Sequence, residues 1–123
     1  MIENNIIELI YQPKRKRVNI FSEQIYDETP FENSKISVDN NVSQDFQNTV
    51  KVIKGVNVHV TITEFKKLEN VSFMFEDTSL LSIPENYIWD MSMVTDISSM
   101  YLNCSLLESI PAIEIWILQM LKI

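Results

Sequence analysis

Two stretches of this chain repeat one another: VSFMFEDTSLLSIPENYIW at 71–89 and ISSMYLNCSLLESIPAIEIW at 97–116. An offset of 26 residues matches three identical positions, and after one inserted residue an offset of 27 matches six more. The identical pairs are Ser72/Ser98, Met74/Met100, Ser79/Ser105, Leu80/Leu107, Ser82/Ser109, Ile83/Ile110, Pro84/Pro111, Ile88/Ile115 and Trp89/Trp116. Nine identities in so short a unit indicate a stacked repeat, whose units bury their apolar faces against one another.

Each copy begins with apolar residues spaced as on one face of a helix. They are Leu68, Val71, Met74 and Phe75 in the first copy and Val94, Ile97, Met100 and Tyr101 in the second. Asn70 and Asp96 stand where helix N-caps would lie. The pattern Leu-x-Ser-Ile-Pro then follows at 80–84 and 107–111, and it predicts a short strand that the proline ends. Each unit is therefore predicted to be a helix followed by a strand, stacked as a solenoid.

The first 67 residues are predicted to be rich in strands. The clearest is 56–63, where Val56, Val58, Val60 and Ile62 share one face and polar residues share the other. Shorter strands are predicted at 6–11 and 18–21, and a hairpin through Gly55 is expected to join 50–53 to the strand at 56–63. The predicted class is α+β, with a β-rich leader at 1–67 that caps two repeats at 68–123. The units are placed at about 68–93 and 94–120, the last one truncated.

The two copies resemble the BspA-like surface-protein repeat, which is related to leucine-rich repeats and occurs in mycoplasma lipoproteins and in protist and lactobacillus surface proteins. The family pattern is roughly Met-Ser-x-Met-Phe-x-x-Cys-x-x-Leu-x-x-Leu-Pro, followed by tryptophan and Val-Thr-x-Met. It is matched by Met74, Phe75, Leu80, Ile83, Pro84, Trp89, Val94 and Thr95, and by Met100, Cys104, Leu107, Ile110, Pro111 and Trp116, while Thr78 replaces the cysteine of the first unit. The resemblance implies a solenoid without catalytic residues, for which adhesion and protein binding are the usual suggestion.

The end of the chain departs from the family pattern. The family continues after the tryptophan with polar residues, whereas this chain has the apolar segment ILQMLKI at 117–123. One hypothesis is that a lost base has shifted the reading frame of a longer repeat protein. The alternative is an ordinary apolar C-terminal strand.

Composition narrows the function classes. A net charge of −7 argues against a general nucleic-acid binder, which needs a basic face. The single cysteine excludes an intramolecular disulfide. The sequence has no long apolar run for a transmembrane helix. It also has no basic and apolar start typical of a signal peptide, so a cytoplasmic location is the default expectation, although the resembled family is often found at the cell surface.

The chemically capable side chains each have a structural interpretation. His59, the only histidine, lies on the polar face of the predicted strand, and Cys104 corresponds to Thr78, which favours packing over nucleophilic chemistry. The run Lys14–Arg17 is read as an exposed turn, with a nuclear-localisation signal or phosphate patch as the alternative. The glycosylation sequons at Asn41, Asn70 and Asn103 are attributed to chance, and the recurrent Trp89 and Trp116 are read as core or edge residues. The carboxylates Asp90, Asp96 and Glu108 have no recurrent paired spacing and are given no acid–base or metal-binding role.

The sequence therefore predicts a non-catalytic protein-interaction module without catalytic, cofactor or metal residues. The expected contact surface is the strand side of the repeats, with Ser82, Glu108 and Ser109. The alternative is a remnant of a larger surface or adhesion protein without independent function. An unknown protein partner is expected, with the chain monomeric or weakly self-associating through the open C-terminal repeat.

Overall fold

The structure is a computed structural model that describes residues 6–84 and 90–108. Its strands are β1 (Ile7–Tyr11), β2 (Arg17–Asn19), β3 (Lys35–Val38), β4 (Gln44–Asp45), β5 (Thr49–Lys51), β6 (Val58–Thr63) and β7 (Leu80–Ser82). One 3-10 turn, η1 (Thr29–Phe31), begins with a proline in its first turn. Proline suits this place because an amide at a helix start has no partner within the helix.

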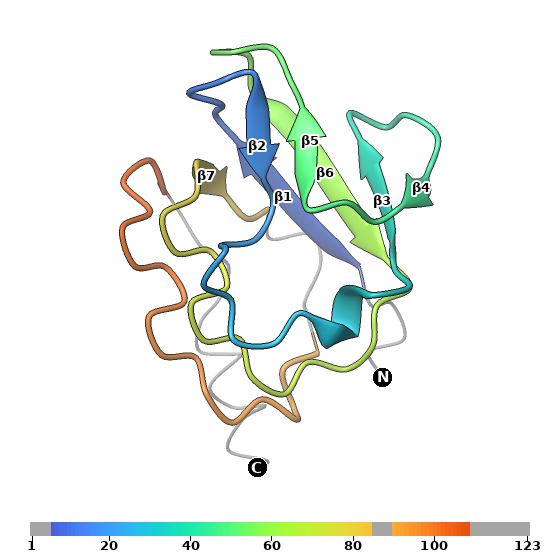
Figure 1. The fold of residues 1–123 in the computed structure, drawn as a ribbon, viewed down its shortest axis with the longest axis vertical. Helices are drawn as coiled ribbons and strands as arrows, with labels where there is room; N and C mark the ends of the chain where they lie inside the picture. The colour runs from blue at the N-terminus through green and yellow to red at the C-terminus, as the bar shows by residue number, and fades with distance from the viewer. Residues whose placement is uncertain (1–5, 85–89, 109–123) are drawn as a thin grey trace.

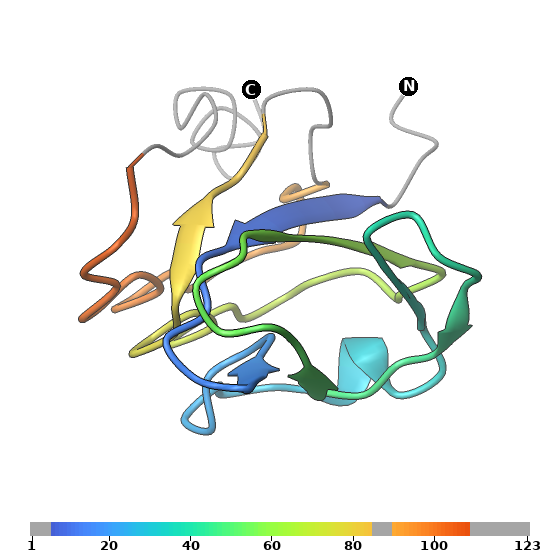
Figure 2. The same cartoon turned by 90° about the horizontal axis from the view of Figure 1, so that it is seen from above.

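A five-stranded sheet in the order β4-β3-β6-β1-β7 forms one layer of the molecule. The two longest strands, β1 and β6, pair antiparallel, with Leu9 opposite Val60 and Ile7 opposite Ile62. Both strands alternate buried and partly exposed residues, so one face of the sheet supplies the core. The short strands β2 and β5 form a second sheet, and Figure 2 shows it facing the larger one across the interior.

The core between the sheets also includes residues of both sequence repeats. Val71, Met74 and Leu80 of the first copy and Val94 and Met100 of the second are buried in the same cluster as the strands. β7 of the first copy pairs directly with β1. The leader and the repeats therefore share one core.

Aromatic rings close the end of the core near η1. Phe21 and Phe31 lie with ring centroids 4.4 Å apart, and Phe31 is 5.5 Å from Phe65. Aromatic pairs at these distances contribute stabilising free energy beyond that of the apolar surface they bury.

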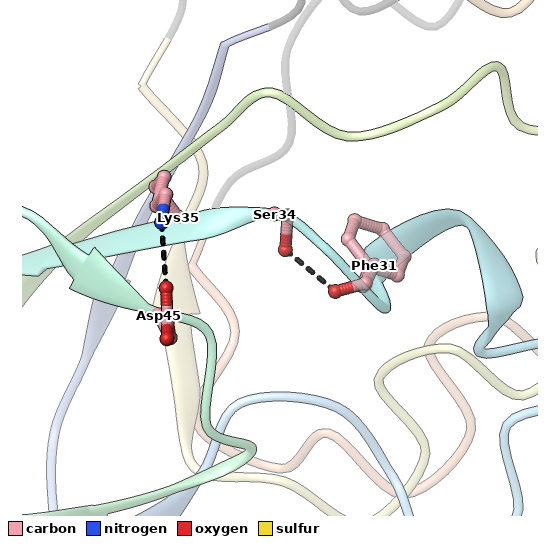
Figure 3. A network of polar contacts seen from close by, with 4 residues as sticks. All are labelled: Phe31, Ser34, Lys35 and Asp45. Atoms are coloured by element: carbon pink, nitrogen blue, oxygen red, sulfur yellow. Dashed lines mark hydrogen bonds and ion pairs between the residues drawn. The ribbon is translucent and has the colours of Figure 1, made fainter.

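Beside η1, two polar contacts attach the sheet edge to the core (Figure 3). Ser34 donates its hydroxyl to the carbonyl of Phe31 at 2.8 Å, while Lys35 of β3 pairs with Asp45 of β4 at 2.5 Å. The hydrogen bond between Lys35 and Asp45, followed by their charge interaction, raises the pKa of the lysine and lowers that of the aspartate. Both groups are exposed, so water screens this pair.

The predicted α+β class is wrong: no α-helix occurs in residues 6–84 and 90–108, the sheets are antiparallel, and they form no solenoid. The segments expected to be helical, 68–75 and 94–101, are successive turns. Positive φ angles explain this, since Phe73 at 60° and Ser99 at 54° lie in the left-handed region that a right-handed helix excludes.

Several strand predictions are confirmed and one pairing is wrong. The segments predicted at 6–11 and 56–63 contain β1 and β6, and the one at 80–84 contains β7. The expected hairpin through Gly55 does not form, because β5 pairs with β2 instead of β6. Gly55 nevertheless has the expected positive φ, at 83°.

The described residues contain no helix with the length and hydropathy of a membrane-spanning segment. The repeat positions Trp89, Ile110, Pro111 and Trp116 lie outside the residues that the structure describes, as does Ser109.

Tyr11 provides a test of this core, because its side chain is fully buried and its hydroxyl donates to the carbonyl of Ile20 at 2.5 Å. We expect Tyr11→Phe to lower the free energy of unfolding by roughly 1 to 2 kcal/mol, since the buried carbonyl loses its donor. Urea unfolding measures the change. Tyr26→Phe is the matched control, because Tyr26 is 72% exposed. Equal stability of the two variants would contradict a structural role for the Tyr11 hydroxyl.

Candidate functional site

The two sequence copies have the same backbone conformation. Positive φ occurs at Phe73 and Asp77 in the first copy and at Ser99 and Asn103 in the second, each pair 26 residues apart. Hydrogen bonds between residues three apart close the same turns in both. These bonds run from Met74, Glu76 and Thr78 to Val71, Phe73 and Phe75, and from Met100, Leu102 and Cys104 to Ile97, Ser99 and Tyr101. The residues 26 positions apart in the sequence therefore also have equivalent backbone conformations.

An Asx turn begins each copy. The side-chain oxygen of Asn70 accepts the amide of Ser72 at 2.9 Å, and that of Asp96 accepts the amide of Ser98 at 2.8 Å. Asn and Asp favour such turns because their short side chains reach the backbone two residues ahead. The side-chain and backbone hydrogen bonds from Ser98 lower the pKa of Asp96.

Backbone hydrogen bonds join the two copies side by side. The amides of four alternate residues in the first copy donate to carbonyls of the second copy at 2.9 to 3.1 Å. The pairs are Val71 to Asp96, Phe73 to Ser98, Phe75 to Met100 and Asp77 to Leu102. Donors at every second residue on one side of a segment are typical of an extended edge. The first copy therefore satisfies its outward amides by contact with the second.

Equivalent side chains also meet. The rings of Phe75 and Tyr101 stack with centroids 5.9 Å apart and 5° between their planes. The Thr78 hydroxyl and the Cys104 thiol both donate to the carbonyl of Phe75 at 2.8 Å and lie 3.9 Å from each other. Burial raises the pKa of the Cys104 thiol, which disfavours the nucleophilic thiolate.

The leader covers the opposite side of the first copy. The amide of Ser22 donates to the carbonyl of Met74 at 2.8 Å, and the amide of Tyr26 donates to that of Ser72 at 3.1 Å. Leader, first copy and second copy are consecutive layers, and each layer donates amides to the carbonyls of the next. In Figure 1 the second copy (orange) accordingly lies outside the first (yellow).

The second copy has an open edge. Its amides at Ile97, Ser99, Tyr101 and Asn103 correspond, at the 26-residue offset, to the four donors of the first copy. Within the part of the chain that the structure describes, these four amides have no hydrogen-bond partner. Ser99 and Asn103 are exposed, whereas Ile97 and Tyr101 are partly buried. We call this row the open edge; its amides can donate hydrogen bonds to the carbonyl oxygens of a neighbouring segment.

Two of the residues predicted as a contact surface, Ser82 and Glu108, lie in the part of the chain that the structure describes. Ser82 is half-buried in β7, opposite Ile10. Glu108 is exposed, and its amide donates to the carbonyl of Leu81 at 2.8 Å. Sequence reasoning missed the amides of the open edge, although the 26-residue offset marks their positions once the first copy's donors are known.

A groove of about 840 Å³ separates the turns of the two copies from the loop before β2. The run Lys14–Arg17 is exposed, as predicted, and lines one side. Glu23, Glu76 and Asp77 are also among the lining residues. Lys14 reaches Ser105 of the second copy, with 3.5 Å between Nζ and Oγ. The groove thus combines charges of both signs.

His59 lies on the outward face of β6, and its Nε2 atom is 3.6 Å from a carboxylate oxygen of Glu8 on β1. Asp90 accepts hydrogen bonds from Ser92, which lower its pKa. Of the residues described, no three histidine, cysteine or acidic side chains are grouped as metal ligands. No family model, curated protein or solved structure matches the chain.

Hydrogen exchange tests the open edge through matched pairs of residues. We expect the amides of Ser99 and Asn103 to exchange at least about 100-fold faster than those of Phe73 and Asp77, after correction for intrinsic rates, because only the first-copy amides are hydrogen-bonded. NMR exchange on the purified chain measures these rates. Equal protection across the pairs would contradict an open edge.

Asp96 predicts a pH dependence of stability. Because its pKa is lowered in the folded chain, its contribution is present above the ordinary value of 3.8 and is lost as the pH falls through the folded value. We expect Asp96→Asn to lose less stability than wild type between pH 5 and pH 2, the range about the ordinary value, since Asn70 makes the same turn without a charge. Thermal unfolding across that range measures the difference. Parallel losses in both proteins would refute the assignment.

Proposed function

We propose that the chain is a non-catalytic protein-interaction module that binds an extended segment of a partner at its open edge. The observation that supports this is the row of amides at Ile97, Ser99, Tyr101 and Asn103, which have no hydrogen-bond partner among the described residues. Their counterparts in the first copy bind carbonyls of a neighbouring segment, so the backbone of the second copy is already shaped for the same contact.

This mode of binding takes its affinity from the main chain of the partner and its specificity from neighbouring side chains. Each backbone hydrogen bond contributes about 0.5 to 1.5 kcal/mol net, so four give a modest affinity that side-chain contacts must increase. Leu102, which is 45% exposed and lies between Tyr101 and Asn103 in the sequence, is available for such contacts, and Glu108 is also exposed. Ser82 and Ser109 complete the contact surface expected from the sequence.

The alternative is a remnant of a larger surface or adhesion repeat protein. In that case the open edge is the place of a further copy of the unit, and the chain has no partner of its own. Weak self-association is a third use of the same edge. The resemblance to BspA-like repeats supports either an interaction module or a remnant.

Ile97 allows a sharp test, because proline there removes one amide of the open edge. Position 97 is the central residue of the Asx turn from Asp96 to Ser98, a place that proline tolerates. Ile97→Ala is the matched control, since it shortens the same side chain and retains the amide. Peptides are first selected for binding to the wild-type chain from a random display library. We expect these peptides to bind Ile97→Pro about fivefold more weakly than Ile97→Ala. Fluorescence anisotropy measures the affinities.

The outcomes separate the alternatives. Selected peptides that bind Ile97→Pro and Ile97→Ala equally would overturn the open edge as the binding site. Failure of any peptide to bind, together with a gain in solubility when a further copy of the unit is fused after the chain, would support the remnant. Concentration-dependent sedimentation abolished by Ile97→Pro alone would identify the partner as a second copy of this chain.

A further inference from the structure

The positive charge of this acidic chain is gathered at one end. Of its ten lysines and arginines, six lie in the loop that precedes β2, at the start of β2, in β5 and in the loop after β5. They are Lys14, Arg15, Lys16, Arg17, Lys51 and Lys54, and all six are exposed. The segments 12–19 and 49–57 contain no acidic residue, although the chain has 17. A patch of this kind creates a local positive field on a molecule whose net charge is −7.

Backbone contacts hold the two loops together. The amide of Gly55 donates to the carbonyl of Pro13 at 2.9 Å, and the amide of Val52 donates to that of Lys16 at the same distance. Arg17 of β2 lies opposite Lys51 of β5. In Figure 1 both loops lie at the top of the molecule, beyond the ends of the strands. The cations therefore form one surface, although they come from distant parts of the sequence.

Two aliphatic side chains project among these cations. Ile53 is 71% exposed and Val56 is 55% exposed, on either side of Lys54 and Gly55. Val56 continues the apolar alternation of β6 in the sequence, yet it lies outside that strand. We call the six cations with Ile53 and Val56 the basic tip.

We propose that the basic tip docks on the surface of a membrane that contains anionic lipids. Lysines and arginines near such a surface are attracted to its headgroups, and exposed aliphatic side chains gain by entering the boundary between headgroups and acyl chains. The acidic remainder of the molecule is repelled, so charge alone favours the tip-first orientation. The tip adjoins the second copy through the contact of Lys14 with Ser105, but the proposal rests on the cations and aliphatic side chains of the tip and does not depend on the proposed function.

A nucleic acid is the less suitable polyanion. Single strands bind through aromatic side chains on which bases stack, and neither 12–19 nor 49–57 contains an aromatic residue. The exposed aliphatic side chains of Ile53 and Val56 do not strengthen a contact with phosphate, but they can enter the boundary between the headgroups and acyl chains of a membrane. The carboxylates of Glu23, Glu76 and Asp77 also line the groove beside Lys14–Arg17 and would repel a phosphate backbone lying along it.

Vesicle sedimentation tests the proposal with the full chain. Vesicles of phosphatidylcholine with about a quarter phosphatidylserine are compared with pure phosphatidylcholine at low and high salt. We expect binding only to the anionic vesicles, and loss of it at high salt. Lys51→Glu with Lys54→Glu should weaken binding at least tenfold, because each cation near such a surface contributes a factor of about five. Lys66→Glu with Lys67→Glu makes the same charge change beyond the opposite end of β6 and should have a much smaller effect.

Ile53→Ser with Val56→Ser tests the apolar part of the tip. These residues are exposed, so we expect an unchanged melting temperature and vesicle binding about tenfold weaker. Equal binding by this variant, or equal losses from the two lysine pairs, would overturn the proposal. So would binding to a DNA duplex or oligonucleotide without binding to anionic vesicles. Ile97→Pro should bind vesicles like wild type, which keeps this result independent of the open edge.

Discussion

The layered part of this molecule depends on the direction of the backbone hydrogen bonds between its layers. The leader donates amides to the first copy, and four alternate amides of the first copy donate to the second, whereas only Thr95 and Glu108 of the described second copy donate back to the first. A peptide unit has one donor and one acceptor, so a stack built this way has unmatched donors at its last layer. The open edge is thus the geometric consequence of how the earlier layers are satisfied. No special side chain is needed to create it.

The sheets provide the apolar core against which the turns of the two copies pack. Turns without helix or long strand bury little apolar surface by themselves, yet Met74, Phe75 and Met100 are almost completely buried. They reach the core because β7 continues the first copy into the five-stranded sheet beside β1. The end of β1 and β6 at which β7 pairs also carries the basic tip. Asn103 of the open edge and the run Lys14–Arg17 accordingly line the same groove.

The sequence predicted part of this arrangement. The alternation of Val58, Val60 and Ile62 located β6, because a strand with one buried face repeats every second residue. The spacing of Val71, Met74 and Phe75 was taken for a helix, but successive turns bury residues at the same intervals. The left-handed residues in these turns could not be predicted from the sequence, since phenylalanine, which occupies position 73, rarely adopts a positive φ. The open edge consists of amides, which every non-proline residue possesses, so side-chain patterns could not reveal it. The basic run was visible at Lys14–Arg17, but its union with Lys51 and Lys54 depends on the pairing of β2 with β5.

The left-handed residues have a further consequence for how the repeats acquire their shape. Outside glycine such conformations cost of order 1 kcal/mol each, and each copy contains two of them. An isolated copy has no contact that offsets this cost, whereas a copy beside a finished layer gains hydrogen bonds and stacked side chains that do. Each layer thus acts as a template for the one after it. The left-handed residues of one copy are therefore stabilised by the layer beside it, so the conformation of each copy depends on its neighbour.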